Sequence, residues 1–448
     1  MTEQGTSTTA DAAANRVINF GAGPSALPLP VLQEASQAIL NFQNTGIGIA
    51  EISHRSKEFT ACIQDVEQQI RTQLQVPPTH EVLFLAGGGT AQFAGAVLNM
   101  LARSWLLNPE KQERTLDYVL TGSWSVAAKK EADRLVVGPS GTGVRVNVVV
   151  DGREGSVDGK SFESIPGREK WKFSEDSDLI YYCENETVSG TQFGFEDVPA
   201  VEGQEPVGEE SALAKEKTTF PFELLPEGKL WPLVGDYSSS FMSRPIPRLA
   251  DHAIIYAGVQ KNLGPAGVTI VIVRHDCIVD VDAAAKLGAI PVPACLSYKA
   301  FKDGKNTPNT PSVFSIYVCG LVLKRNAELG GIGYYLELNR RKKEKVYKVV
   351  KEGEAKRVLR LKVKEASGSW MNVVFTVLGE GAEARFLEGA DERGMKGLKG
   401  HRSVGGIRVS LYNAVTEEEV DKLVAYIREF IQEEQKGKPS LPSETVAV

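Results

Sequence analysis

Cysteine and histidine are both scarce in this chain of 448 residues, which contains five of each. The cysteines are odd in number and form no Cys-x-x-Cys pair, so we expect reduced thiols of a cytosolic protein rather than a disulfide framework. The histidines are not clustered, so we expect no zinc or other metal site.

Long hydrophobic runs are also lacking. The longest candidate, Val268 to Val273, has the length of a strand and is far shorter than the roughly 18 residues of a membrane helix. Residues 1–16 contain no apolar core of a secretory signal, and we expect them to form a disordered tail. These features predict a cytoplasmic protein that has no membrane partner.

The chain has no excess of positive charge, because 51 Lys and Arg residues face 57 Asp and Glu residues, a net charge of −6. This balance argues against a nucleic-acid partner held by bulk charge. Any site for an anion must therefore be local. With 42% apolar residues, the chain can bury a large core.

Strands alternate with helices from Val17 onward, which predicts an α/β fold with a mainly parallel sheet covered on both faces. We expect a large domain over residues 17–320 and a smaller C-terminal α+β domain over 321–448. Residues 195–230 are acidic and contain Pro and Gly, which predicts a surface insertion. Thr416 and Glu419 form a capping box that predicts the start of the last helix.

Lys261 and Asp236 are the first candidates for chemistry. Lys261 lies between two apolar runs, so its amine should be partly desolvated and its pKa lowered, which favours a nucleophilic amine. Asp236 follows the buried run Trp231 to Val234 and needs a partner there, for example a protonated pyridine nitrogen. Taken alone, each has an ordinary alternative: a lysine that extends to water, and an aspartate that caps a turn.

A run of three glycines at 87–89, followed by Thr90, marks a predicted strand-to-helix junction, where free N–H groups can hold an anion. Trp124 begins a predicted helix and could stack on a flat ring. Thr187 follows a predicted strand and could bond a ring hydroxyl. A tight turn, a core tryptophan and a turn threonine are the respective alternatives.

The triplet His-Arg-Ser occurs twice, at 54–56 and at 401–403. Arginine offers a bidentate fork, and histidine is a second donor, so such pairs suit a phosphate or a carboxylate. Either triplet could instead be an exposed salt-bridge cluster.

A reactive lysine, an upstream aspartate, a glycine-rich anion site, a stacking tryptophan and a threonine near the ring are together what pyridoxal 5′-phosphate requires. At this point the sequence resembles the phosphoserine aminotransferase family. The resemblance rests on motifs that span nearly the whole chain from residue 19: NFGAGPSALP (19–28), EISHRSKEF (51–59), GGGTAQF (87–93), YCENETVSG (182–190), GDYSSSF (235–241), YAGVQKNLGPAG (256–267), NTPNTPSVFSIY (306–317) and HRSVGGIRVSLYNAV (401–415).

The resemblance implies the aspartate-aminotransferase-like fold, known as fold type I, with a seven-stranded sheet. It implies a ping-pong transfer of the amino group between L-glutamate and 3-phosphohydroxypyruvate, which yields 2-oxoglutarate and O-phospho-L-serine in serine biosynthesis. It also implies a homodimer with the active site at the subunit interface. An alternative is another fold-type I enzyme that acts on a different small amino acid.

The resemblance also implies roles for individual residues. Lys261 would form the Schiff base with the cofactor and act as general base and acid, while Asp236 would pair with the pyridinium nitrogen. The other cofactor-binding residues would be Gly89, Thr90, Trp124, Thr187 and Gln260, with Asn306 and Thr307 from the partner subunit. Substrate would be bound by His54, Arg55, His401 and Arg402.

Three features depart from the family pattern. Thr90 stands where some members have Arg, which would leave more of the substrate binding to Arg55 and Arg402. Asn309 replaces the second proline of the usual NTPPT motif, and the insertion at 195–230 is longer than in compact relatives.

Overall fold

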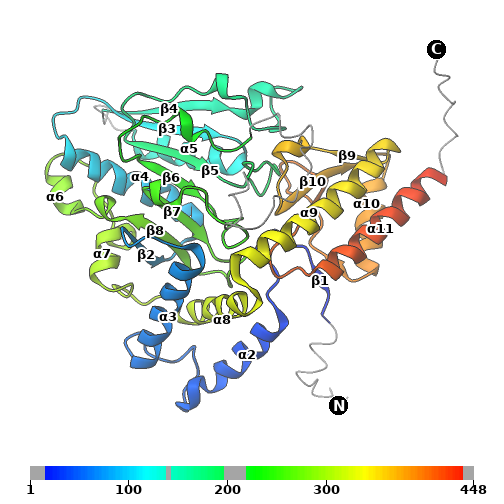
Figure 1. The fold of residues 1–448 in the computed structure, drawn as a ribbon, viewed down its shortest axis with the longest axis horizontal. Coiled ribbons are helices and arrows are strands. Elements are labelled where there is room, and N and C mark those ends of the chain that lie inside the picture. Colours follow the sequence, from blue (N-terminus) through cyan, green and yellow to red (C-terminus); the bar gives the residue numbers. More distant parts are fainter. Residues whose placement is uncertain (1–15, 138–142, 196–217, 437–448) are drawn as a thin grey trace, which may run out of the picture.

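A computed structural model describes residues 16–137, 143–195 and 218–436 (Figure 1). The predicted disordered tail therefore lies outside the described residues except for Arg16, as does most of the predicted surface insertion. Among the described helices, none is long and apolar enough to cross a membrane.

A seven-stranded sheet forms the centre of the larger part, in the order β2-β8-β7-β6-β5-β3-β4. Neighbouring strands are parallel except that β8 runs antiparallel to both β2 and β7. The predicted fold class, a mainly parallel seven-stranded α/β sheet, is confirmed. The strands are β2 (His80–Leu85), β3 (Arg114–Leu120), β4 (Val144–Asp151), β5 (Leu179–Cys183), β6 (Leu233–Asp236), β7 (Ile254–Gly258) and β8 (Thr269–Arg274).

Helices cover both faces of this sheet. Successive side chains of each strand point to opposite faces, and both sets are apolar and packed against helices. In β5, Tyr181 belongs to the core cluster formed with α4 and α5, whereas Tyr182 belongs to the cluster formed with α2, α3 and α8. These helices are α2 (Leu29–Leu40), α3 (Lys57–Leu74), α4 (Gly88–Leu107), α5 (Ser123–Leu135) and α8 (Val313–Leu329); the short helices α6 (Val281–Lys286) and α7 (Tyr298–Asp303) follow β8.

A separate hydrophobic cluster lies in the C-terminal part, on the right of Figure 1. It contains a three-stranded antiparallel sheet in the order β12-β10-β9, packed against α9, α10 and α11. The bounds are α9 (Gly331–Ala355), β9 (Leu359–Leu361), β10 (Asn372–Val377), α10 (Ala382–Glu392), β12 (Ile407–Ser410) and α11 (Glu417–Lys436), and the strands β1 (Ile18–Asn19) and β11 (Met395–Lys396) pair beside them. The division at residues 320 and 321 stays a prediction.

Two local sequence signals can be compared directly with the structure. At the start of α11, Glu419 accepts from the N–H of Thr416 at 2.8 Å, and the Glu419 N–H donates to Thr416 Oγ1 at 3.2 Å, so the predicted capping box is confirmed. Within 195–230, however, Phe220 and Leu225 are buried in the large core, which differs from the surface position expected for this segment. The last part of the segment is anchored because both side chains are large and apolar.

Candidate active site

A cavity of about 290 Å³ opens at the carboxyl ends of β5, β6 and β7, next to the first turns of α4 and α5. Ligands of open α/β sheets bind at this edge, because the loops that follow the strands converge there with helix N-termini. Residues from both parts of the molecule line the cavity: Ala22, Gly23, Gly89, Thr90, Phe93, Trp124, Cys183, Asn185, Thr187, Val188, Asp236, Ser238, Ser239, Gln260, Lys261, His401 and Arg408.

Lys261 lies on the short connection between the antiparallel strands β7 and β8. The connection is closed by a hydrogen bond from the N–H of Val259 to the carbonyl of Val268 at 3.2 Å. The Lys261 amine donates to Thr187 Oγ1 at 2.7 Å and lies 6.0 Å from the centroid of the Trp124 ring. Burial lowers the pKa of Lys261, and the nearby carboxylate of Asp236 opposes this shift. The amine is therefore shifted toward its neutral, proton-accepting form.

Asp236 is the last residue of β6 and is 5% exposed. Its Oδ1 accepts from the N–H of Ser238 at 2.9 Å, and the hydroxyl of Tyr181 lies 3.5 Å from its Oδ2. Burial raises its pKa. Within the described part of the chain, this carboxylate has no ion-pair partner, so the site favours a cationic donor from a ligand.

The glycine run lies at the N-terminus of α4. Gly87 is the N-cap with a φ of 92°, which glycine adopts readily, and the first amides of α4 have no acceptor within the helix. A Cβ on Gly89 would lie 3.3 Å from Ser238 Oγ and 3.7 Å from Asp236 Oδ2, so the absence of a side chain keeps the helix N-terminus close to the cavity floor. This arrangement suits an anion.

Trp124 and Thr187 line the cavity from two different elements. Trp124 is the second residue of α5 and is 36% exposed, and Thr187 is buried in the loop after β5. Gln260 lies beside Lys261 and also lines the cavity.

Arg408 is a lining residue that sequence reasoning did not select. It comes from β12, and its Nη1 donates to the carbonyl of Thr187 at 3.4 Å. Its Nε is buried and has no hydrogen-bond partner among the described residues. A signal was available in the strand Ile407–Ser410, because an arginine between the buried Ile407 and Val409 must point to the opposite face.

The two His-Arg-Ser triplets are placed differently. His401 lines the cavity, and its Nδ1 contacts Ser403 Oγ at 2.6 Å, whereas Arg402 is exposed and does not line it. His54 and Arg55 precede α3, where Ser56 Oγ caps the helix by accepting from the N–H of Phe59 at 3.1 Å. Neither residue lines the cavity of its own chain as far as the structure describes it.

Asn306 and Thr307 also lie outside this lining. The side chain of Asn306 is bonded to the main chain of β2, accepting from the N–H of Phe84 at 3.2 Å and donating to the carbonyl of Val82 at 3.1 Å. Asn306 thus fixes the outer strand of the sheet within its own chain. The role expected for both residues, toward a partner subunit, stays a prediction.

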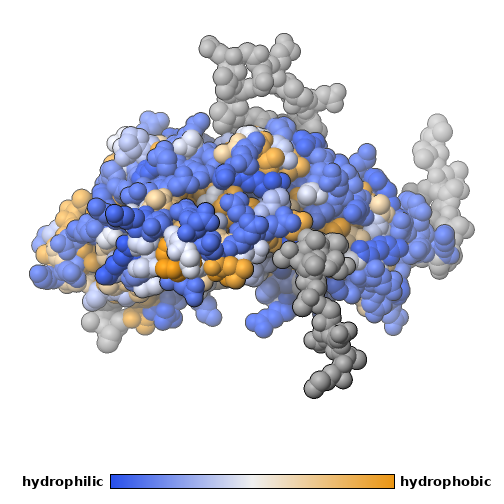
Figure 2. Space-filling model, turned by 90° about the horizontal axis from the view of Figure 1, so that it is seen from below, coloured by the Kyte–Doolittle hydropathy of each residue, from blue (hydrophilic) through white to orange (hydrophobic). Residues whose placement is uncertain are grey.

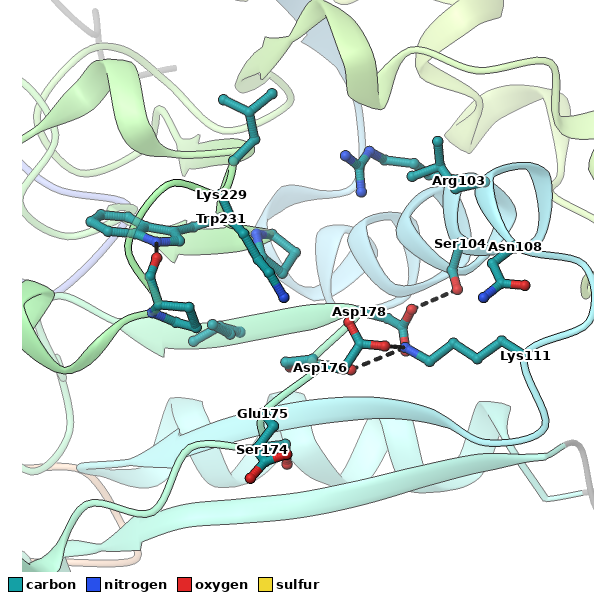
Figure 3. Close-up of a pocket in the computed structure, with 16 residues that line it drawn as sticks. Arg103, Ser104, Asn108, Lys111, Ser174, Glu175, Asp176, Asp178, Lys229 and Trp231 are labelled. Carbon is teal, nitrogen blue, oxygen red and sulfur yellow. Dashed lines mark hydrogen bonds and ion pairs between the residues drawn. The ribbon is translucent and has the colours of Figure 1, made fainter.

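A second cavity of about 230 Å³ lies near the amino end of β5 (Figure 3). Its polar groups bind one another: Lys111 reaches Asp178 at 2.8 Å and Asp176 at 2.9 Å, and Ser104 Oγ donates to Asp178 at 2.6 Å. The N–H of Thr115 donates to Asp178 at 2.8 Å. These bonds tie α4 to β3 and β5, so this cluster is structural.

Comparison with known proteins identifies the class to which this fold and cavity belong. The model of the aminotransferase class-V family matches residues 17–203 and 229–423. The chain therefore belongs to the class-V aminotransferases.

Within this class, the similarity is to phosphoserine aminotransferases. The chain is 37% identical over 418 residues to the phosphoserine aminotransferase of Ectopseudomonas mendocina (strain ymp), covering 93% of this chain and 99% of that protein. The solved phosphoserine aminotransferase from Bacillus circulans subsp. alkalophilus superposes with a TM-score of 0.75 at 32% identity, covering 94% and 99% of the two chains. The PLP-bound phosphoserine aminotransferase from Trichomonas vaginalis has a TM-score of 0.74 at 32% identity, with coverage of 92% and 100%. The family resemblance drawn from the motifs is confirmed.

Proposed function

We propose that this aminotransferase transfers an amino group between L-glutamate and 3-phosphohydroxypyruvate, yielding 2-oxoglutarate and O-phospho-L-serine, with pyridoxal phosphate as cofactor. The observation that carries the proposal is the placement of the Lys261 amine, 2.7 Å from Thr187 Oγ1, in a cavity that also holds Asp236. The relatives named phosphoserine aminotransferase, similar over almost their whole length, support the choice of substrate.

The lining residues fit this cofactor. The amides that begin α4, at Gly89 and Thr90, would hold its phosphate together with Gln260. Trp124 would cover one face of the ring, and Thr187 would bond its hydroxyl. Asp236, a buried carboxylate without an ion-pair partner in the described part of the chain, would face the ring nitrogen. When bound, the cofactor supplies an electron sink that stabilises the charge left by proton removal from the substrate carbon.

Lys261 supplies the base. Because burial lowers its pKa, its Nζ can accept the proton from the substrate Cα and later return it. The bond to Thr187 Oγ1 keeps the amine at the cavity wall and does not remove its lone pair, since the amine is the donor. Asp236 contributes by remaining ionised opposite a cationic ring nitrogen, which offsets the cost of burying both charges.

Arg408 would bind the carboxylate that both amino-acid substrates share. Its buried Nε has no partner in the described structure, and a carboxylate would accept from Nε and a terminal nitrogen in the bidentate geometry that arginine favours. His401, on the same rim, would contribute a further donor to an anionic substrate. This leaves Arg402, His54 and Arg55 for the distal phosphate of phosphoserine or the distal carboxylate of glutamate.

A second copy of the chain would complete the site. His54, Arg55, Asn306 and Thr307 lie outside the lining of their own cavity, so their expected contacts with ligand would be made in the cavity of a partner subunit. Four exposed large hydrophobic residues lie between positions 29 and 47: Leu29, Ile39, Leu40 and Ile47. Figure 2 views the side of the molecule on which α2 lies, and hydrophobic residues gather on this face. Such a patch is typical of a subunit interface.

A visible absorption spectrum of the purified, cofactor-loaded protein tests the proposal. We expect O-phospho-L-serine to bleach the absorbance of the bound cofactor, because its amino group is transferred, whereas plain L-serine should not. Equal responses to the two compounds would retain the aminotransferase class and reject the phosphate-specific substrate, which would favour a different small amino acid.

A further inference from the structure

Glu186 is a buried carboxylate that the chemistry described above does not use. It lies in the loop after β5 and is fully buried. Its Oε2 accepts from the N–H of Trp124 at 2.7 Å, and its Oε1 accepts from the N–H and the hydroxyl of Ser125 at 2.8 and 2.6 Å. Three donors therefore converge on one carboxylate inside the protein, where such bonds are strong.

These bonds cap helix α5 from a distant part of the chain. The N-cap residue of α5 is Gly122, which has no side chain to accept from the free amides of the first turn. Glu186 accepts from two of these amides at the positive end of the helix dipole. Burial raises the pKa of Glu186 to about 7, and the hydrogen bonds from Ser125 and Trp124 oppose this shift in favour of the carboxylate. A Cβ on Gly122 would overlap the Glu186 carboxylate, so glycine at this position makes room for the cap.

The next residue along the chain from Glu186, Thr187, also lines the cavity. Thr187 accepts from the Lys261 amine, and its carbonyl accepts from Arg408. The loop itself is held by a bond from the Glu186 N–H to the carbonyl of Thr191 at 2.8 Å, and Thr191 Oγ1 donates to the carbonyl of Thr121 at 2.6 Å. Trp124 and Thr187 are thus held together through Glu186.

We propose that Glu186 is a positioning residue that fixes Trp124 relative to Thr187 and so sets the orientation of the cofactor ring between them. This inference rests on the proposed cofactor chemistry. The role requires a carboxylate, because two main-chain N–H groups and a hydroxyl all donate to it. In Glu186→Gln the side chain keeps its size, but its NH₂ group must face one of these donors.

The test compares Glu186→Gln with the native enzyme, both fully loaded with cofactor. The first readout is the visible circular dichroism of the bound cofactor, which reports the asymmetry of its surroundings. We expect the ellipticity per bound cofactor to fall to half or less and the dissociation constant of the cofactor to rise at least several-fold. We also expect kcat to fall at least tenfold, with less than a twofold change in KM for phosphoserine. A purely structural role would lower the melting temperature and leave the ellipticity and kcat of the folded, loaded enzyme unchanged, which would overturn the proposal.

A matched control is available at α6, where Asp280 Oδ1 accepts from the N–H groups of Asp282 and Ala283. Asp280→Asn makes the same carboxylate-to-amide change at an exposed helix cap outside the cavity lining, so we expect ellipticity and kcat to be unchanged; losses equal to those of Glu186→Gln would overturn the proposal. If Glu186→Gln does not fold, Ser125→Ala removes one of the three donors and should shift ellipticity in the same direction by less; no shift would overturn the proposal. A native protein that binds the cofactor but does not respond to phosphoserine would reject the substrate assignment and leave this test intact.

Discussion

The guanidinium of Arg408 lies against the main chain of Thr187, with Nη1 at 3.4 Å from the Thr187 carbonyl. Arg408 comes from the small sheet and Thr187 from the loop after β5, so this contact joins the two parts of the molecule at the cavity. The orientation leaves the buried Nε without a partner in the described structure and available to a ligand.

Substitution of Arg408 should weaken the binding of both amino-acid substrates to the same extent. We expect Arg408→Lys to lower kcat/KM for phosphoserine and for glutamate by about ten- to a hundredfold, since a lost charge-assisted hydrogen bond costs about 1.5–3 kcal/mol. Lysine keeps the charge but cannot form the bidentate fork. Steady-state kinetics with each substrate provides the measurement. A loss confined to phosphoserine would instead assign Arg408 to the distal phosphate.

Removal of the Lys261 amine should abolish both turnover and the covalent attachment of the cofactor. We expect Lys261→Ala to lose the visible absorbance that the native protein retains after gel filtration, because no other amine lies at this position. Lys286→Ala, at the end of α6, is a matched lysine substitution outside the cavity lining and should keep native activity. Turnover by Lys261→Ala at the native rate would reject the proposed base.

A mixture of two inactive variants tests whether the site is shared between subunits. Arg55→Ala and Lys261→Ala chains, unfolded and refolded together, should form hybrid dimers in which one site carries both changes and the other carries neither. If Arg55 serves the partner's cavity, we expect about a quarter of the native sites to be active. If Arg55 serves its own cavity, every site in the hybrid keeps one defect, and the mixture should stay as inactive as the separate variants.

His252 should make the stability depend on pH in the acid range. The ring is fully buried, with Nδ1 at 3.0 Å from the carbonyl of Arg248 and Nε2 at 2.7 Å from the hydroxyl of Tyr182, which fits a neutral ring that donates through Nδ1. Burial lowers its pKa to about 4 from the ordinary 6.5. As the pH falls from 6.5 to 4, His252 therefore takes up a proton in the unfolded chain before it does so in the folded protein. Over that range, this group lowers the free energy of unfolding by up to about 3 kcal/mol.

Urea unfolding at several pH values measures this effect. In His252→Gln we expect lower stability at pH 7, because the bond from Tyr182 is disturbed, but a shallower loss between pH 6.5 and 4. An unchanged slope would show that other groups control the acid limit.

Several positions that line the candidate cavity could be singled out from the sequence because their signals are local. Asp236 ends an apolar strand, and Lys261 lies between two apolar runs, so the pattern along the chain singled out both positions, while their roles came from the family resemblance. The two identical His-Arg-Ser triplets show the limit of local signals. Only tertiary packing brings His401 to the cavity and leaves His54 at the start of α3.

Long-range partners explain the features that were missed. Arg408 required knowledge of which face of a four-residue strand meets the loop after β5. Likewise, composition suggested a surface segment at 195–230, yet Phe220 and Leu225 are drawn into the core by aromatic and aliphatic neighbours from β5 and β6. Composition averages over a segment, whereas burial is decided by single side chains.

The satisfied cluster at Asp178 has a consequence for how this enzyme can change. It lies near the amino end of β5, whereas the loop that follows the carboxyl end of the same strand lines the candidate active-site cavity. Substitutions at the Asp178 end should be selected by their effect on folding, and those at the cavity end by their effect on turnover. Because the two ends share little beyond the strand itself, evolution or engineering can alter substrate choice at one while the other keeps the fold intact.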